Sequence, residues 1–163
     1  MVKIINVMAS SLDGAISRGQ YEADENRWDF GFNCQEDRNL LARELRQADA
    51  IITGAQSVRA SKTLTTVPDL EKQPDWFIYT QRGLEGNLPF WNQDNLNIKF
   101  ISPRELKLAQ SKKNISNLCY NDLNSAKFLY EHLHEASYKR VLLFGGGKIN
   151  SLFYQNSLCE KLF

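Results

Sequence analysis

The residue pattern with the clearest chemical meaning lies near the end of the chain, where three glycines follow an apolar run. Val141–Phe144 are all apolar, Gly145–Gly147 come next, and Ile149–Tyr154 has the apolar spacing of a helix. Glycines let the phosphates of another molecule approach the backbone, and a helix N-terminus directs free N–H groups to the same place. Lys148 adds a positive charge. The pattern indicates an anion-binding turn or an ordinary tight turn, because it matches neither the spaced dinucleotide fingerprint nor a Walker A loop.

Two other apolar runs are followed by similar polar turns, each with a hydroxyl group and an arginine that suit phosphate or ribose. The residues are Gly54, Ser57 and Arg59 after the run 50–53, and Thr80 and Arg82 after the run 76–79. Ligands of open α/β sheets bind beyond the carboxyl ends of the strands, so we expect these turns to share one anion-binding rim. The alternative is that Ser57 caps a helix and that Arg59 is a solvated surface charge.

Side chains for acid–base, nucleophilic or metal chemistry are scarce. His132 and His134 are two residues apart on a predicted helix, so they do not share a face, and we interpret them as solvated. Cys34, Cys119 and Cys159 are widely spaced and predict neither a disulfide framework nor a zinc site. We therefore expect no metal and assign no catalytic residue. A cofactor-binding site with little acid–base apparatus fits hydride transfer, in which the cofactor supplies the chemistry.

The elements that must position these turns alternate between strand and helix along the chain. Strands are predicted at 2–9, 50–53, 76–79, 98–101, 117–120 and 141–144, and helices at 34–48, 56–60, 124–136 and 149–154. This order predicts an α/β fold with a largely parallel sheet. The loop at 17–33 carries Trp28, Phe30 and Phe32 at alternate positions, where they either cover a flat ring or plug the core.

Composition limits the class of protein. With 163 residues and 42% apolar content, the chain predicts a single domain over 1–163. The formal net charge of +1 argues against a broad nucleic-acid or membrane surface. No apolar run approaches the roughly 20 residues of a spanning helix, and the N-terminus has no export signal. We expect a soluble cytoplasmic protein.

Four motifs in this order resemble those of a known family. They are Met8–Gly14 (MASSLDG), Glu44–Gly54 (ELRQADAIITG), Ser57–Ala60 with Leu64 and Thr65, and Phe144–Lys148 (FGGGK) continuing to 158–162 (LCEKL). Together they resemble the RibD C-terminal family, the reductase domain of riboflavin biosynthesis. The resemblance spans nearly the whole chain and implies a dihydrofolate reductase-like α/β fold. In that fold helices flank a mostly parallel central sheet, here shortened at its C-terminal end.

The resemblance implies an NADPH-dependent reductase similar to 5-amino-6-(5-phosphoribosylamino)uracil reductase, which transfers a hydride from the nicotinamide to the sugar C1. It places Thr80 and Arg82 near the adenosine 2′-phosphate and assigns Asn26 and Arg46 to the substrate. Together with the strand-end turns, it gives the expected NADPH-binding residues: Ala9, Trp28, Gly54, Ser57, Arg59, Ser61, Thr80, Arg82, Gly145, Gly146, Gly147, Lys148 and Ile149.

The chain departs from the family pattern on the substrate side. Phe144 replaces a substrate-binding glutamate, Ser61–Thr63 replaces an Asp-x-Pro motif, and Thr66–Pro68 stands where the family has an arginine. Phenylalanine cannot accept the hydrogen bonds that a carboxylate would. The alternatives are therefore a reductase of dihydrofolate, another pteridine or a small carbonyl compound, or an inactive nucleotide-binding remnant.

The family continues into more strands beyond the position of Phe163, where this chain stops. An unfinished sheet edge favours association with another strand. We therefore expect a homodimer that acts on a small pyrimidine-like or pteridine-like molecule.

Overall fold

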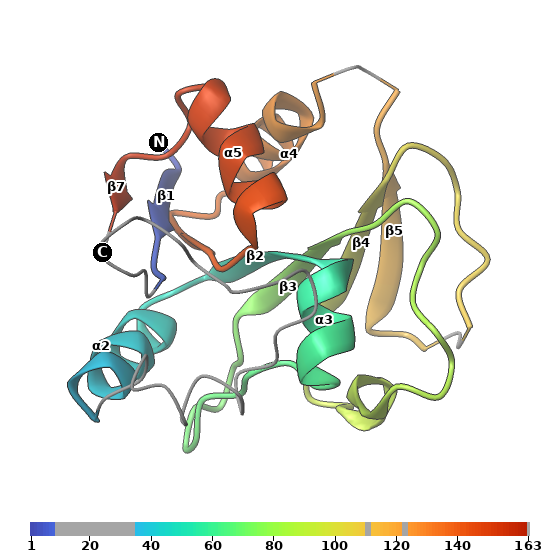
Figure 1. Cartoon of the computed structure of the whole chain (residues 1–163), viewed down its shortest axis with the longest axis horizontal. Coiled ribbons are helices and arrows are strands. Elements are labelled where there is room, and N and C mark those ends of the chain that lie inside the picture. Colours follow the sequence, from blue (N-terminus) through green and yellow to red (C-terminus); the bar gives the residue numbers. More distant parts are fainter. Residues whose placement is uncertain (9–34, 110–111, 122–123, 163) are drawn as a thin grey trace.

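The computed structural model describes residues 1–8, 35–109, 112–121 and 124–162, in which strands and helices alternate (Figure 1). Their bounds, in chain order, are β1 (Lys3–Asn6), α2 (Gln35–Arg46), β2 (Ala50–Gly54), α3 (Ala55–Ser61), β3 (Asp75–Tyr79), the 3₁₀ helix η1 (Pro89–Asn92), β4 (Ile98–Ser102), β5 (Ile115–Cys119), α4 (Ser125–Glu135), β6 (Arg140–Leu143), α5 (Gly147–Gln155) and β7 (Lys161–Leu162).

The strands of the described residues form one seven-stranded sheet in the order β5-β4-β3-β2-β6-β1-β7. Every pairing in it is parallel. Parallel neighbours need long crossover connections, and helices supply most of them here. The α/β fold with a largely parallel sheet that the sequence predicted is therefore confirmed.

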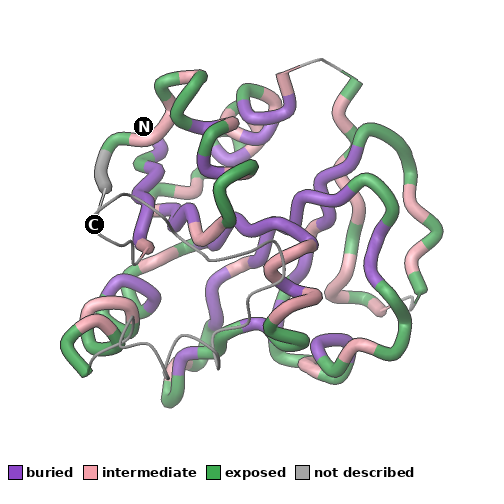
Figure 2. The backbone as a smooth tube through the Cα atoms, in the orientation of Figure 1, coloured by how far each residue is buried: buried purple, intermediate pink, exposed green. Residues whose placement is uncertain are grey.

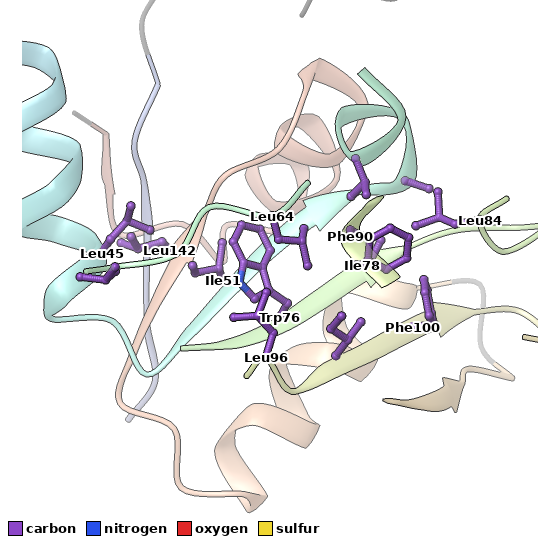
Figure 3. Packing of buried hydrophobic residues seen from close by; sticks show 14 of the residues in the cluster. Leu45, Ile51, Leu64, Trp76, Ile78, Leu84, Phe90, Leu96, Phe100 and Leu142 are labelled. Atoms are coloured by element: carbon purple, nitrogen blue, oxygen red, sulfur yellow. The ribbon is translucent and has the colours of Figure 1, made fainter. Parts of the chain in front are cut away.

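Two apolar clusters fill the two faces of the sheet. One includes Leu45 of α2 and Ile51 of β2 (Figure 3). The other includes Ile52 of β2, Leu129 of α4 and Phe153 of α5. Ile51 and Ile52 are adjacent in sequence and fully buried, but the pleat of the strand turns them to opposite faces. Figure 2 shows the resulting buried layer through the middle of the molecule. Helices α2 and α3 thus cover one face, and α4 and α5 cover the other.

The chain leaves two neighbouring strands in opposite directions. After β2 it passes through α3 to β3, whereas after β6 it passes through α5 to β7, on the far side of β1. In sheets of this type, ligands bind beyond the carboxyl ends of the strands where the order reverses. We call the ends of β2 and β6, with the N-termini of α3 and α5, the switch point. Phe144 N donates to Ile52 O at 2.8 Å, which joins the two strand ends.

The structure also differs in detail from the predicted elements. β1 is shorter than the predicted strand at 2–9, and β5 begins two residues before the predicted 117–120. The sequence did not predict η1, in which Phe90 and Trp91 are buried, or β7, which exists through its pairing with β1. The predicted loop at 17–33 lies outside the described residues. Among the described helices, none has the length and apolar character of a membrane span.

Candidate functional site

Gly54 and Gly145 at the switch point have a packing role that the sequence did not predict. A β-carbon on Gly145 would lie 2.9 Å from Cβ of Ile149, and one on Gly54 would lie 3.0 Å from Cγ1 of the same residue. Both separations are shorter than ordinary van der Waals contacts. These two glycines therefore let α5 approach the strand ends. Ile149, predicted to bind the cofactor, packs its half-buried side chain between them.

Gly146 is different, because the described residues leave the space beside it open. Among them, a β-carbon on Gly146 would meet only the hydroxyl oxygen of Ser57, at 3.9 Å. Gly146 is also the N-cap of α5 and supplies no side chain to its first turn. Its carbonyl accepts from the N–H groups of Ile149 and Asn150, whereas helix geometry directs the N–H groups of Gly147 and Lys148 outward.

The switch point thus brings together four predicted residues: Ser57, Gly146, Gly147 and Lys148. Ser57 lies in the first turn of α3, and the other three begin α5. Gly146, Gly147 and Lys148 are exposed. An exposed helix N-terminus without a capping side chain, with a lysine and a serine hydroxyl beside it, is suited to an anion such as a phosphate.

The turn after β3 uses the hydroxyl of Thr80 for its own structure. Thr80 Oγ1 accepts from the backbone N–H groups of Arg82 and Gly83 at 3.3 and 3.0 Å, and it donates to Gly83 O at 3.1 Å. Gly83 has a φ of +80°, a conformation that favours glycine. Thr80 is buried in this turn and Arg82 is exposed. Thr80 therefore shapes the turn that carries Arg82.

Arg59, predicted to bind a phosphate, is held by a carboxylate of this chain. Its Nε donates to Oε1 and Oε2 of Glu85 at 2.9 and 3.0 Å, and its Nη2 donates to Gly83 O at 2.8 Å. The hydrogen bond from Arg59 lowers the pKa of Glu85 below its ordinary value. The guanidinium thus ties α3 to the turn after β3. The sequence did not single out Glu85, which is 26 positions from Arg59.

Ser61 and Arg46 are not brought to the switch point. The hydroxyl of Ser61, at the far end of α3, donates to Ser57 O and Thr63 O at 3.0 and 2.8 Å. Arg46 ends α2 four positions before β2 begins, so it lies toward the amino-terminal edge of the sheet. The other predicted residues, Ala9, Asn26 and Trp28, lie outside the described residues.

Phe144 and Asn150 define the rest of the site. Phe144 is half-buried and packs against the apolar cluster that α2 and α3 cover, so it extends the core to the end of β6. Asn150 is only 4% exposed, yet its Oδ1 has no hydrogen-bond partner among the described residues. Its Nδ2 contacts the sulfur of Met8 at 3.2 Å, a weak acceptor. Asn150 belongs to the run 146–152 that the family resemblance implies contacts NADPH, but no local pattern predicted its burial three positions before the buried Phe153.

An open cavity of about 470 Å³ lies elsewhere on the molecule. It is lined by Thr66, Val67, Pro68, Asp69, Leu70, Glu71, Gln73 and Asn95. Gln73 and Asn95 come shortly before β3 and β4, which places the cavity at the amino-terminal edge of the sheet. It is therefore separate from the switch point.

The comparisons with known proteins agree with this fold and with the order of the motifs. A family model described as the RibD C-terminal domain matches residues 2–163. The chain belongs to this family. No curated protein matches this RibD C-terminal domain in sequence.

Solved structures share the fold of this RibD C-terminal domain. RibD of Acinetobacter baumannii has a TM-score of 0.72 and 20% identity, covering 99% of this chain and 45% of that one. A diaminohydroxyphosphoribosylaminopyrimidine deaminase/5-amino-6-(5-phosphoribosylamino)uracil reductase from Thermotoga maritima has a TM-score of 0.70 and 20% identity. The match covers 95% of this chain and 42% of that one. A pyrimidine reductase-like protein from Corynebacterium diphtheriae has a TM-score of 0.73 and 15% identity, and the match covers 99% of this chain and 72% of that one. The chain spans less than half the length of the first two proteins. The shared fold with these reductase domains confirms the predicted dihydrofolate reductase-like fold.

Proposed function

We propose that this RibD C-terminal domain is an NADPH-dependent reductase that binds its cofactor at the switch point. The observation that carries the proposal is the open backbone of Gly146 at the uncapped N-terminus of α5, opposite the hydroxyl of Ser57. Family membership and the likeness to reductase structures support it.

The residues present fit a dinucleotide. The exposed N–H groups of Gly147 and Lys148 would donate to the pyrophosphate, and the ammonium group of Lys148 would balance its charge. The Ser57 hydroxyl would donate from the opposite side. Arg82, exposed on the turn after β3, is the cation available for a 2′-phosphate. When bound, NADPH supplies the hydride.

The proposed substrate is 5-amino-6-(5-phosphoribosylamino)uracil, reduced at the sugar C1. The likeness to the Thermotoga maritima 5-amino-6-(5-phosphoribosylamino)uracil reductase supports this class of substrate. Phe144 favours a second candidate, a dihydropteridine or a small carbonyl compound. Because its ring extends the apolar cluster at the end of β6, it offers a surface for packing and no hydrogen-bond acceptor.

The proposal includes a cytoplasmic location and a homodimer. Cys119 is an exposed free thiol, which fits a reducing compartment. Strand β5, whose partner among the described residues is β4, supports association through its open edge. Light scattering of the purified protein measures the mass in solution, and a monomeric mass rejects the dimer.

Titration of the purified protein with NADPH, followed by cofactor fluorescence and calorimetry, tests the cofactor. Gly146 has a φ of −73°, which any residue adopts, and its β-carbon has room, so Gly146→Val is expected to fold. We expect its side chain to block the pyrophosphate and weaken NADPH binding more than tenfold, by more than about 1.4 kcal/mol. Lys148→Ala is expected to weaken binding less, and Lys127→Ala, at an exposed position of α4, is the matched control.

Turnover separates the substrate candidates. NADPH oxidation is measured with the phosphoribosylaminouracil, with dihydrofolate and with small aldehydes. Oxidation by the uracil compound supports the first candidate, and oxidation only by another compound supports the second. Binding without oxidation by any of them would identify a nucleotide-binding remnant, whereas absence of NADPH binding at millimolar concentration would reject the whole proposal.

A further inference from the structure

An ion pair beside the switch point has no role in the function proposed so far. Arg59 and Glu85 contact each other through Nε and both carboxylate oxygens, and Nη2 of Arg59 reaches the carbonyl of Gly83. The pair spans α3 and the turn after β3. Its side chains are 30% and 55% exposed, so a dissolved molecule can reach them.

The location of the pair follows from the strand order. Helix α3 starts directly after Gly54 of β2, and Arg59 contacts the turn after β3, the strand next to β2. Neighbouring strands are about 4.8 Å apart. A dinucleotide with its pyrophosphate at Gly146 that extends across the end of β2 therefore reaches this turn with one of its riboses. Arg59 and Arg82 make this the end that suits a phosphorylated ribose.

The charges at this turn favour two different cofactors. In dinucleotide sites, a carboxylate that accepts from the ribose 2′-hydroxyl selects the unphosphorylated cofactor, whereas an arginine accommodates the 2′-phosphate. Both groups are present here, and Glu85 occupies the edge of Arg59 that a phosphate would use. A 2′-phosphate must displace this carboxylate and also meets its negative charge. An unphosphorylated ribose neither has to displace the carboxylate nor is repelled by its charge.

We propose that Glu85 is a specificity-determining residue, which occupies the guanidinium of Arg59 and so lowers the preference of the site for NADPH over NADH. This inference rests on the proposed function, because it requires a dinucleotide at the switch point. Arg82 remains available to bind the 2′-phosphate, whereas Glu85 occupies Arg59, which would otherwise be a second arginine for it. The ion pair is half-exposed and therefore weak, so a competing phosphate can open it.

Calorimetric titration with NADPH and with NADH tests the inference on the purified chain. Glu85→Gln removes the charge and keeps the shape, and the backbone carbonyl of Glu85 still accepts from Trp91 Nε1. We expect about fivefold tighter NADPH binding, the effect of removing one nearby like charge at the protein surface. The affinity for NADH is expected to stay within about twofold. Glu131→Gln, at an exposed position of α4, is the control with the same change of net charge.

The double variant Arg59→Met/Glu85→Gln isolates the role of Arg59 and is expected to lose the gain. An unchanged ratio of NADPH to NADH affinity in Glu85→Gln would overturn the inference, as would a gain that persists in the double variant. A purely structural role would shift the thermal midpoint and both affinities together. If the wild-type chain binds neither dinucleotide, the proposed function fails as well; if it binds both and the ratio stays unchanged, only this inference fails.

Discussion

Single residues at the switch point have separate tasks, although several of them are glycines. Gly145 and Gly54 admit the side chain of Ile149, whereas Gly146 leaves backbone open to solvent. The difference follows from what a β-carbon at each position would touch. Substitutions of the neighbouring glycines should therefore change the free energy of unfolding by different amounts, and the larger loss identifies the glycine that is needed for packing.

Gly145→Ala is expected to destabilise the fold by about 1–3 kcal/mol, because its β-carbon would lie 2.9 Å from Cβ of Ile149 and the packing there would have to shift. Gly146→Ala is the matched control, with a β-carbon 3.9 Å from its neighbour, and is expected to be nearly neutral. Urea unfolding measures both. Equal losses in the two variants would contradict the packing role of Gly145.

Asn150 is a second residue with an unusual environment. Its side chain is almost fully buried, and the part of the chain that the structure describes offers its Oδ1 no hydrogen-bond partner, so folding removes water from that atom without a replacement there. Asn150→Leu keeps the shape and is expected to stabilise the fold by about 1 kcal/mol. That gain corresponds to a rise of about 2–4 °C in the thermal midpoint of a chain of this size. A drop in the midpoint would show that the amide makes a needed hydrogen bond.

At the scale of elements, side chains from distant parts of the chain join helices to turns. Arg59 joins α3 to the turn after β3, and its hydrogen bond is the main cause of the low pKa of Glu85. A lowered pKa in the folded state means that the contact stabilises the fold above the ordinary pKa of a glutamate. That stabilisation is lost as the pH falls through the lowered pKa.

We expect the pKa of the Glu85 carboxyl group to lie below its ordinary value, and Arg59→Met to raise this pKa, because the hydrogen bond from Arg59 is the main cause of the lowering. The ion pair between Arg59 of α3 and Glu85 should weaken as this carboxylate becomes protonated. Carbon-detected NMR of the glutamate side chains measures the titration in the wild type and in Arg59→Met. A Glu85 midpoint that is identical in the wild type and in Arg59→Met would show that the ion pair does not form in solution.

For the whole molecule, the important feature is that helices from opposite faces of the sheet meet at the switch point. Helices α3 and α5 cover opposite faces but begin beside each other at the ends of β2 and β6. A ligand held between their N-termini therefore contacts both halves of the core. Because such a ligand binds only the folded state, its binding energy adds to the stability of the whole domain.

NADPH is expected to raise the thermal midpoint of the wild-type chain. At 100 times its dissociation constant the gain is about 2.7 kcal/mol, or roughly 5–10 °C for a domain of this size. A differential scanning experiment with increasing NADPH measures the shift, and Gly146→Val is expected to abolish it. A shift of the same size in that variant would place the cofactor away from the switch point.

The sequence alone determined the features that depend on local pattern. Alternating apolar runs predicted the parallel sheet, and the glycines after Val141–Phe144 predicted a turn with an open backbone. Four ordered motifs predicted the family. Such features need only neighbouring residues, because strand and helix periodicity and the freedom of glycine act within a few positions.

Only the tertiary structure decided which residues are partners. It paired Arg59 with Glu85, and it packed Ile149 against Gly54, 95 positions earlier in the chain. It also placed Arg46 away from the switch point and left Oδ1 of Asn150 without a partner within the described ranges. The physical reason is the strand order, which places β6 beside β2 and so joins residues that no local pattern connects.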